Sequence, residues 1–267
     1  MRGGVRGVHA VLLLILLISG SGYGRIMHMK LSDSISDWIK EKVLGAGCRG
    51  VVFGLSGGLD SAVVALLCKK AFPVNCLALI LPCNSLREDV IQAEEFAADF
   101  GIKHKEIELS NVFGSLCKKL EGEPCNNERE LHVANLKPRL RMAALYYYAQ
   151  KMNYLVIGTG NRSELMMGYF TKYGDGGVDL LPIGGLLKTE VRELAKELGV
   201  PKELIEKAPS AGLWHGQTDE AEMGITYAEL DRVLLGKLDG IDEERILLVR
   251  ERVKKSEHKR RSPEIYK

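Results

Sequence analysis

Eight consecutive residues in the first quarter of the chain combine glycines with hydroxyl and carboxylate side chains in a pattern suited to anion binding. They are Gly54, Leu55, Ser56, Gly57, Gly58, Leu59, Asp60 and Ser61. Glycines let the backbone approach a ligand closely, and the N–H groups of such a turn and of a following helix N-terminus attract phosphate. Asp60 would repel phosphate unless a divalent cation lay between them. The pattern therefore indicates a site for a polyphosphate bound to Mg²⁺.

This segment differs from a Walker A loop, which carries a lysine directly after its last glycine. It resembles the pyrophosphate loop of ATP pyrophosphatases, which split ATP between its α and β phosphates. A simpler interpretation is a turn whose Ser or Asp side chains cap the next helix. Capping explains one such residue, but not the whole ordered set of glycines and polar residues. We therefore favour ATP binding by residues 54–61, which we call the Ser–Gly loop.

Strands and helices alternate around the Ser–Gly loop. After a helix with an apolar face at 35–43, we expect strands at 51–55, 74–81, 104–109 and 154–157, separated by helices at 62–71, 87–100 and 136–152. This alternation predicts an α/β fold with a Rossmann-like parallel sheet covered by helices on both faces. Ligands bind at the carboxyl ends of such strands, where a second glycine turn, Gly158-Thr159-Gly160, follows the fourth strand. Helices at 188–198 and, singly or as a pair, at 218–236 predict C-terminal helical additions.

The composition fits one ordinary globular domain, which we place at residues 27–267. The chain has 267 residues, of which 46% are apolar and 27% charged, and its net charge is +2. Such a weak charge gives no field for binding nucleic acid. Six cysteines without a C-x-x-C pair indicate reduced thiols in the cytoplasm rather than a disulfide framework.

The first 26 residues depart from this picture. Arg2 and Arg6 precede an apolar run at 8–18, as in a secretory signal peptide, and the run is too short for an ordinary membrane span. The other interpretation is a wrongly assigned start codon, with Met27 or Met29 as the true start. We favour this second interpretation because ATP chemistry belongs in the cytoplasm, and we expect no membrane association. Without the segment the net charge becomes −1.

Further motifs follow the Ser–Gly loop in a fixed order. They are N-L-K-P-R-L-R-M at 135–142, G-T-G-N-R-S-E at 158–164, G-Y-F-T-K-Y-G-D-G-G-V-D at 168–179, K-A-P-S-A-G-L at 207–213 and E-H-K-R at 257–260. Together they closely resemble the NAD synthetase family over about residues 31–262. The Ser–Gly loop alone occurs in several enzymes, whereas the block at 170–179 is far more restrictive.

The resemblance implies a ligase for the final step of NAD biosynthesis. In that family the carboxylate of deamido-NAD (nicotinic acid adenine dinucleotide) attacks the α-phosphate of ATP, and ammonia then displaces AMP to form NAD. Some members carry a glutaminase domain that supplies the ammonia. Only about 50 residues precede the Ser–Gly loop here, so the resemblance implies the ammonia-dependent form without that domain. Family members are homodimers with the dinucleotide site near the subunit interface.

The same resemblance assigns roles to individual positions. It implies Mg²⁺ binding by Asp60 and Glu164, and catalytic roles for Asp60, Lys188 and Asp179. The implied ATP contacts are the Ser–Gly loop, Thr159, Lys188 and Ser210. The implied deamido-NAD contacts are Arg139, Lys172, Asp179, His258 and Lys259.

Alternatives remain for several of these positions. Arg141 is as plausible a dinucleotide contact as Arg139, and residues 257–261 taken alone read as a charged, disordered tail. Asp175 or Asp179 is a candidate to orient ammonia. Rival functions are a tRNA thiolase, another amidating synthetase such as GMP synthetase, and a non-enzymatic ATP sensor.

Overall fold

Four parallel strands form the sheet that positions the Ser–Gly loop. The computed structural model describes residues 30–125, 127–214 and 216–266, so the leader-like segment and the starts at Met27 and Met29 lie outside the described residues. The strands are β1 (Gly50–Gly54), β2 (Cys76–Ile80), β3 (His104–Glu106) and β4 (Tyr154–Ile157), in the order β3-β2-β1-β4. The chain moves outward from β1 through β2 to β3 and then returns to the other side of β1. Such a reversal leaves a crevice between the carboxyl ends of β1 and β4.

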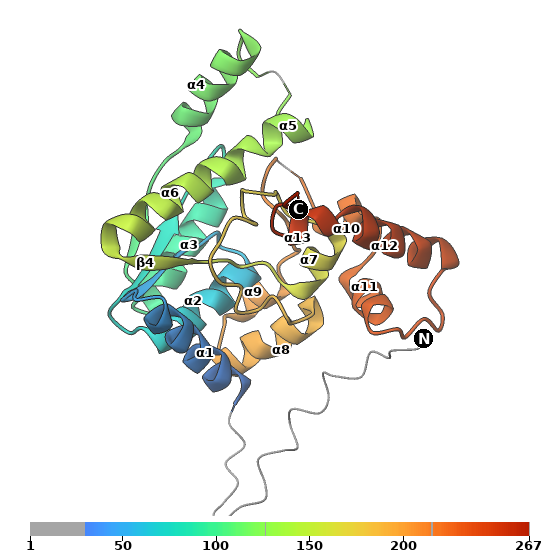
Figure 1. Cartoon of the computed structure of the whole chain (residues 1–267), viewed down its shortest axis with the longest axis horizontal. Helices are drawn as coiled ribbons and strands as arrows, with labels where there is room; N and C mark the ends of the chain where they lie inside the picture. Colours follow the sequence, from blue (N-terminus) through green and yellow to red (C-terminus); the bar gives the residue numbers. More distant parts are fainter. Residues whose placement is uncertain (1–29, 126, 215, 267) are drawn as a thin grey trace, which may run out of the picture.

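Helices join these strands and continue beyond them (Figure 1). They are α1 (Leu31–Gly45), α2 (Leu59–Ala71), α3 (Arg87–Asp99), α4 (Ser110–Glu121), α5 (Leu131–Ala134), α6 (Leu136–Met152), α7 (Arg162–Met167), α8 (Lys188–Leu198), α9 (Lys202–Glu206), α10 (Asp219–Met223), α11 (Tyr227–Leu234), α12 (Glu243–Lys255) and α13 (Glu257–Arg260).

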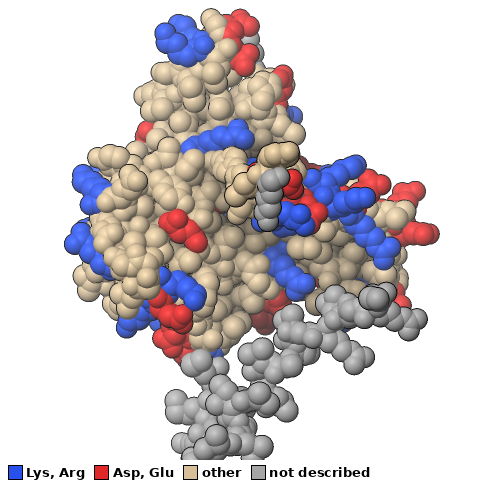
Figure 2. All heavy atoms as spheres, in the orientation of Figure 1, with Lys and Arg blue, Asp and Glu red and all other residues tan. Residues whose placement is uncertain are grey.

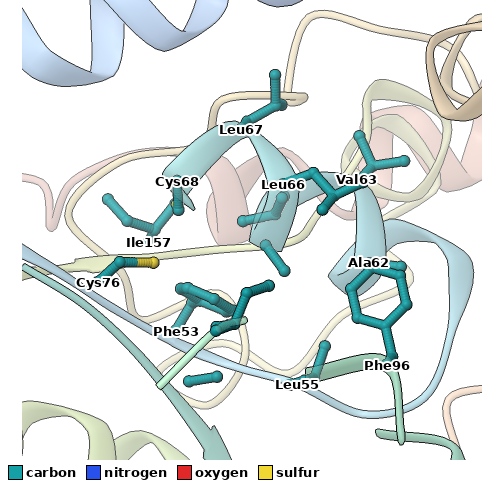
Figure 3. Close-up of a cluster of buried hydrophobic side chains, with 14 of the residues drawn as sticks. Phe53, Leu55, Ala62, Val63, Leu66, Leu67, Cys68, Cys76, Phe96 and Ile157 are labelled. Carbon is teal, nitrogen blue, oxygen red and sulfur yellow. The ribbon is translucent and has the colours of Figure 1, made fainter. Parts of the chain in front are cut away.

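Both faces of the sheet are buried, as the continuous apolar strands require. Val51 and Phe53 of β1 point to one face, where they pack with side chains of α1, α2, α3, α8 and α9. Figure 3 shows Phe53 below the apolar side chains of α2, in the cluster that also includes Phe96 of α3. Val52 points to the other face and packs with side chains of α4 and α6. The predicted fold class, a parallel sheet with helices on both faces, is confirmed.

A third apolar cluster joins α7 to the C-terminal helices α10, α11 and α12, which lie together at one side of the molecule in Figure 1. The predicted C-terminal helical additions are therefore present. Residues 218–236 form two helices, because the chain turns at Gly224, whose φ of +74° is a left-handed conformation that favours glycine. None of the described helices is both long enough and apolar enough to cross a membrane.

Candidate active site

A cavity of about 620 Å³ opens at the carboxyl ends of β1 and β4. Seven of the eight residues of the Ser–Gly loop line it, and Gly57 is the exception. Gly57 has a φ of +74°, and a Cβ there would lie 2.5 Å from the backbone oxygen of Asp89. Gly57 therefore lets the loop pack closely against α3, while its neighbours face the cavity.

Hydrogen bonds within the Ser–Gly loop hold it in shape. The Ser61 hydroxyl donates to the carbonyl of Gly58 at 2.8 Å and accepts from the backbone N–H of Ser56 at 3.2 Å. Gly58 is the N-cap of α2, and no side chain caps this helix. The capping interpretation of these serines and Asp60 is therefore wrong. The N-terminus of α2 instead opens to the cavity with N–H groups that are free to bind an anion.

Lys188 is buried between two carboxylates that the sequence predicted as metal ligands. Its Nζ contacts Asp60 Oδ2 and lies 3.3 Å from Glu164 Oε1, and only 3% of its side chain is exposed. Asp60 and Lys188 stand at the N-termini of α2 and α8, while Glu164 lies in the first turn of α7. Three segments far apart in the sequence thus converge on one point in the cavity wall.

The electrostatics of this cluster depend on burial. Burial raises the pKa of Glu164 to about 8; Lys188 opposes this rise and Asp60 adds to it. Burial lowers the pKa of Lys188, but the attraction of Asp60 and Glu164 is stronger, so its pKa is raised overall. Lys188 therefore stays positively charged next to the Ser–Gly loop.

Glu164 also has a local structural role. Its Oε2 accepts from the backbone N–H of Asn161 at 3.2 Å, and the Asn161 side chain accepts from the backbone N–H of Glu164, which is a capping box for α7. Its other oxygen, Oε1, faces Lys188 and the hydroxyl of Tyr227. One oxygen therefore fixes the helix and the other is directed at the cluster.

The other predicted ATP contacts also line the cavity. Thr159 follows β4, and Ser210 lies in the loop after α9. This loop is tied back by Lys207, whose Nζ donates to the Gly57 carbonyl at 3.1 Å and to Asp89 at 2.6 Å. Lys207 therefore connects the loop that carries Ser210 with the Ser–Gly loop.

The predicted deamido-NAD contacts divide into two groups. Lys259 lines the cavity, and its Nζ donates to the carbonyls of Gly168 and Phe170 at 2.7 and 2.8 Å. The other four, Arg139, Lys172, Asp179 and His258, do not line it. Lys172 Nζ donates to the carbonyl of His258 at 2.8 Å, and Arg139 donates to that of Lys172 at 3.5 Å. Arg139, Lys172 and His258 thus form a cluster at the surface, which we call the outer cluster.

Asp179 is engaged with the backbone of the sheet. Its Oδ2 accepts from the N–H of Val156 in β4 at 2.7 Å, and its Oδ1 accepts from the Tyr146 hydroxyl at 3.0 Å. Both oxygens thus hold the 174–179 loop against β4 and α6. Asp175, the other candidate to orient ammonia, lines the cavity and accepts from the N–H of Thr171 at 2.9 Å.

Arg139 and Arg141 point in different directions, because residues two apart on a helix are separated by about 200°. Arg139 is exposed, whereas Arg141 lines the cavity and donates to the carbonyl of Leu81 at 3.0 Å. No acidic side chain within the described residues forms an ion pair with Arg141. Of the two arginines, Arg141 is therefore the one available to an anion inside the cavity.

The C-terminal segment is folded, so its interpretation as a disordered tail is wrong. Arg260 donates from Nη1 to the carbonyls of Leu165 and Met166 at the end of α7, and from Nη2 to the carbonyl of Val253. These bonds satisfy carbonyls that a helix C-terminus leaves unpaired. They also bring Lys259 to the cavity. Figure 2 shows lysine and arginine side chains gathered over this C-terminal region.

Two residues next to Lys188 were not predicted from the sequence: Asp219 lines the cavity, and Tyr227 is fully buried. Asp219 and Tyr227 complete the cluster around Lys188, since the Tyr227 hydroxyl lies 3.2 Å from Glu164 and 3.0 Å from Asp219. They are more than 50 residues from Glu164 in the chain. No local pattern of spacing marks them, so only the folded chain reveals them.

This arrangement defines a class of protein. A serine- and glycine-rich turn opens onto a helix N-terminus at the switch point of a parallel sheet, beside a buried lysine, as expected for an α/β enzyme that binds ATP through a pyrophosphate loop. A sequence profile described as NAD synthase matches residues 31–263. The chain belongs to the NAD synthase family.

Individual relatives agree with this assignment. The NH(3)-dependent NAD(+) synthetase of Carboxydothermus hydrogenoformans is 48% identical over 244 residues, which cover 90% of this chain and 98% of that protein. The structure of NMN synthetase from Francisella tularensis is similar with a TM-score of 0.82 at 39% identity, covering 88% of this chain and 97% of that one. The NH3-dependent NAD synthetase from Campylobacter jejuni has a TM-score of 0.75 at 34% identity, covering 89% and 98% of the two chains.

Proposed function

We propose that the protein amidates deamido-NAD with ammonia at the expense of ATP, releasing NAD, AMP and pyrophosphate. The observation that carries this proposal is the buried Lys188, held between Asp60 and Glu164 beside the Ser–Gly loop. An ATP sensor has no need for a buried cation at the point where pyrophosphate would leave. The names of the relatives supply the substrate class.

In the first half-reaction, the substrate carboxylate attacks the α-phosphorus of ATP. A new O–P bond forms, the bond to the bridging oxygen of the β-phosphate breaks, and pyrophosphate leaves with the bonding electrons. Negative charge then grows on the departing pyrophosphate. The Lys188 ammonium, the Ser56 hydroxyl and the free N–H groups of α2 are placed to stabilise that charge.

In the second half-reaction, the nitrogen of ammonia attacks the carbonyl carbon of the adenylated substrate. The C–N bond forms, the C–O bond to AMP breaks, and the nitrogen loses one proton to give the neutral amide.

Mg²⁺ fits the donor set that the residues provide. Asp60 Oδ1 is buried and has no hydrogen-bond partner among the described residues, and Glu164 lies on the other side of Lys188. No group of three or more metal-ligating side chains occurs in the described ranges. Two carboxylates suit Mg²⁺, which usually keeps several waters and takes its remaining ligands from phosphates. Bound by Asp60 and Glu164, it would neutralise charge on the triphosphate.

We also propose that two copies of the chain form the complete dinucleotide site. The outer cluster of Arg139, Lys172 and His258 lies outside the cavity of its own chain. A dinucleotide is long and strongly anionic, so a basic cluster on a partner chain could receive the part that extends beyond the cavity. Gel filtration and an Arg139→Ala variant with a raised KM for deamido-NAD would support this arrangement.

The cytoplasm is the proposed compartment, and residues 27–267 the proposed single domain. All six cysteines carry free thiols, and the cavity draws on elements from β1 to α13. We propose ammonia as the nitrogen source because the names of two relatives describe them as NH3-dependent.

A second candidate is amidation of the corresponding mononucleotide. The similarity to the NMN synthetase structure favours it, because the TM-score of that structure, 0.82, is higher than the 0.75 of the Campylobacter jejuni NAD synthetase. The same cavity would serve, but the outer cluster would have no role.

The function is tested by following labelled pyrophosphate into ATP. We expect exchange only when deamido-NAD and Mg²⁺ are present, and NAD formation with ammonium but not with glutamine. Exchange with the mononucleotide instead would establish the second candidate. Absence of exchange with both deamido-NAD and the mononucleotide would refute both candidate functions.

A further inference from the structure

Asp219 is a buried carboxylate with an unused oxygen at the cavity wall. It is the first residue of α10, and only 4% of its surface is exposed. Its Oδ2 accepts from the hydroxyl of Tyr227 at 3.0 Å, whereas its Oδ1 is buried without a partner among the described residues. Burying a charged oxygen without a partner is costly. The position therefore suits a ligand that donates hydrogen bonds.

The surroundings of Asp219 are rich in acidic groups. Tyr227 joins it to Glu164, and Glu222 lies nearby, accepting from Gln217 Nε2 at 2.8 Å. Glu222 has one cation near its backbone, Arg252, which donates to the Glu222 carbonyl at 3.1 Å. A hydrogen-bond donor with a positive charge is therefore the kind of ligand that suits Asp219.

The geometry favours a small monovalent cation over a second metal ion. The carboxylates near Asp219 do not converge on one point, since no group of three or more metal-ligating side chains occurs in the described ranges. With so few protein ligands, Mg²⁺ depends on phosphate oxygens and waters for its octahedral set, and the proposed function already places it at Asp60 and Glu164. An ammonium ion has four N–H donors and no fixed coordination geometry.

The same cluster already holds an alkylammonium group. Lys188 Nζ lies between Asp60 and Glu164 and 5.0 Å from the centre of the Tyr227 ring. Carboxylates and an aromatic face together stabilise an ammonium ion. Asp219, which accepts from the Tyr227 hydroxyl, offers a further buried carboxylate next to this group.

We propose that Asp219 binds the substrate ammonium ion and holds it beside the point where the adenylated carboxylate is formed. The Tyr227 hydroxyl lies 3.0 Å from Asp219 Oδ2 and 3.2 Å from Glu164 Oε1, so it sets the distance between this ammonium site and the carboxylates around Lys188. This inference rests on the proposed function and adds the place at which the nitrogen donor waits.

The two half-reactions separate this role from ATP binding. In Asp219→Asn we expect the KM for ammonium to rise about tenfold or more, because a charge-assisted hydrogen bond is lost. Deamido-NAD-dependent exchange of pyrophosphate, measured without ammonium, should fall much less than the rate of NAD formation at low ammonium. Asp239→Asn, an exposed acid outside the cavity, is the matched control and should change neither quantity.

Two outcomes would overturn the inference. An unchanged KM for ammonium in Asp219→Asn would show that the carboxylate does not hold the ion. Loss of exchange together with a raised Mg²⁺ requirement would make Asp219 part of the metal or ATP site. Absence of exchange in the wild-type protein would instead refute the proposed function, so the two failures are distinguishable.

The melting temperature of each variant is measured alongside the kinetics. If Asp219→Asn does not fold, the comparison is made in Asp219→Glu, which keeps the charge but moves it by one methylene. A raised KM for ammonium with exchange retained supports the site in that variant, and an unchanged KM contradicts it.

Discussion

Lys188 occupies a position that disfavours its charge. It is the first residue of α8, where the helix dipole opposes a cation, and its side chain is almost fully buried. The carboxylates of Asp60 and Glu164, the ring of Tyr227 and, to a smaller extent, Asp219 compensate for this. The helix dipole and burial both disfavour a cation here. A cation kept at such a position is expected where a reaction generates negative charge.

Replacing Lys188 by Met should abolish most of the adenylation activity. We expect the rate of deamido-NAD-dependent pyrophosphate exchange to fall by about 10²–10³, the usual effect of losing one group that stabilises a transition-state charge. The unpaired acids should also lower the free energy of unfolding by about 3–5 kcal/mol. Lys196→Met on the exposed side of the same helix is the control. Exchange retained in Lys188→Met would exclude the proposed role.

At the residue scale, the sequence predicts the residues that lie in short motifs. The Ser–Gly loop, Thr159 and Glu164 follow strands whose carboxyl ends form the cavity, so the position of each could be inferred from the fold class. Asp219 and Tyr227 could not be inferred, because they come from the helical additions and have no local signature. The different directions of Arg139 and Arg141 follow from helix geometry, but only the structure shows which one faces the cavity.

Turning to the elements, the Ser–Gly loop depends on one glycine for its contact with α3. In Gly57→Ala, the left-handed φ costs about 1–2 kcal/mol, and the new Cβ would lie 2.5 Å from the Asp89 carbonyl oxygen. We expect the loop to shift and the KM for ATP to rise, as measured by the dependence of exchange on ATP. Gly45→Ala, at the end of α1 with open space around it, should leave the KM unchanged. An unchanged KM in Gly57→Ala would mean that the loop tolerates the shift.

The loop after α9 should depend on Lys207. Lys207 donates to the carbonyl of Gly57 and to Asp89 and Gln92 in α3, so it holds two ligand loops in one arrangement. Lys207→Met should raise the KM for ATP about tenfold while the melting temperature changes little, because the side chain is partly exposed. Lys202→Met, an exposed lysine in α9, is the control. A fall in melting temperature without a change in KM would instead indicate a purely structural contact.

Most elements follow from apolar periodicity, and those that do not are weakly buried. The strands and helices of the parallel sheet were predicted with shifts of a few residues at their ends. The short helices α5, α9 and α13 were not predicted, and neither were the longer helices α4 and α12. Only Phe113 and Cys117 are buried in α4, and only Val249 in α12. A stripe this narrow gives little sequence signal, and the neighbouring elements decide whether such a segment becomes a helix.

On the scale of the whole molecule, the buried thiols make stability sensitive to alkaline pH. Burial raises the pKa of Cys76 from 9.0 to about 12, against a small opposing effect of Lys69. A group whose pKa is raised by folding contributes its full stabilisation below pH 9 and loses it as the pH rises towards 12. The unfolding free energy should fall by about 1 kcal/mol per pH unit in this range from Cys76 alone.

Urea unfolding of the wild type and of Cys76→Ala at pH 8, 9, 10 and 11 measures this contribution. The variant should lose less stability between pH 9 and 11 than the wild type does. Cys48→Ala, at a half-exposed thiol, should follow the wild type. Equal pH dependence in Cys76→Ala and the wild type would contradict the effect of burial.

The cavity wall takes side chains from both faces of the sheet and borders the C-terminal bundle. Leu55 and Leu59 belong to the cluster with α1 and α2, Leu81 and Leu145 to the one with α6, and Tyr169 packs on the cluster of α10 and α11. Each cluster is held together by its own apolar contacts. We therefore expect local opening on heating to begin at the boundaries between the clusters. The turnover rate should therefore fall at temperatures below the melting temperature. A bound nucleotide that contacts all three clusters should reduce this loss of activity.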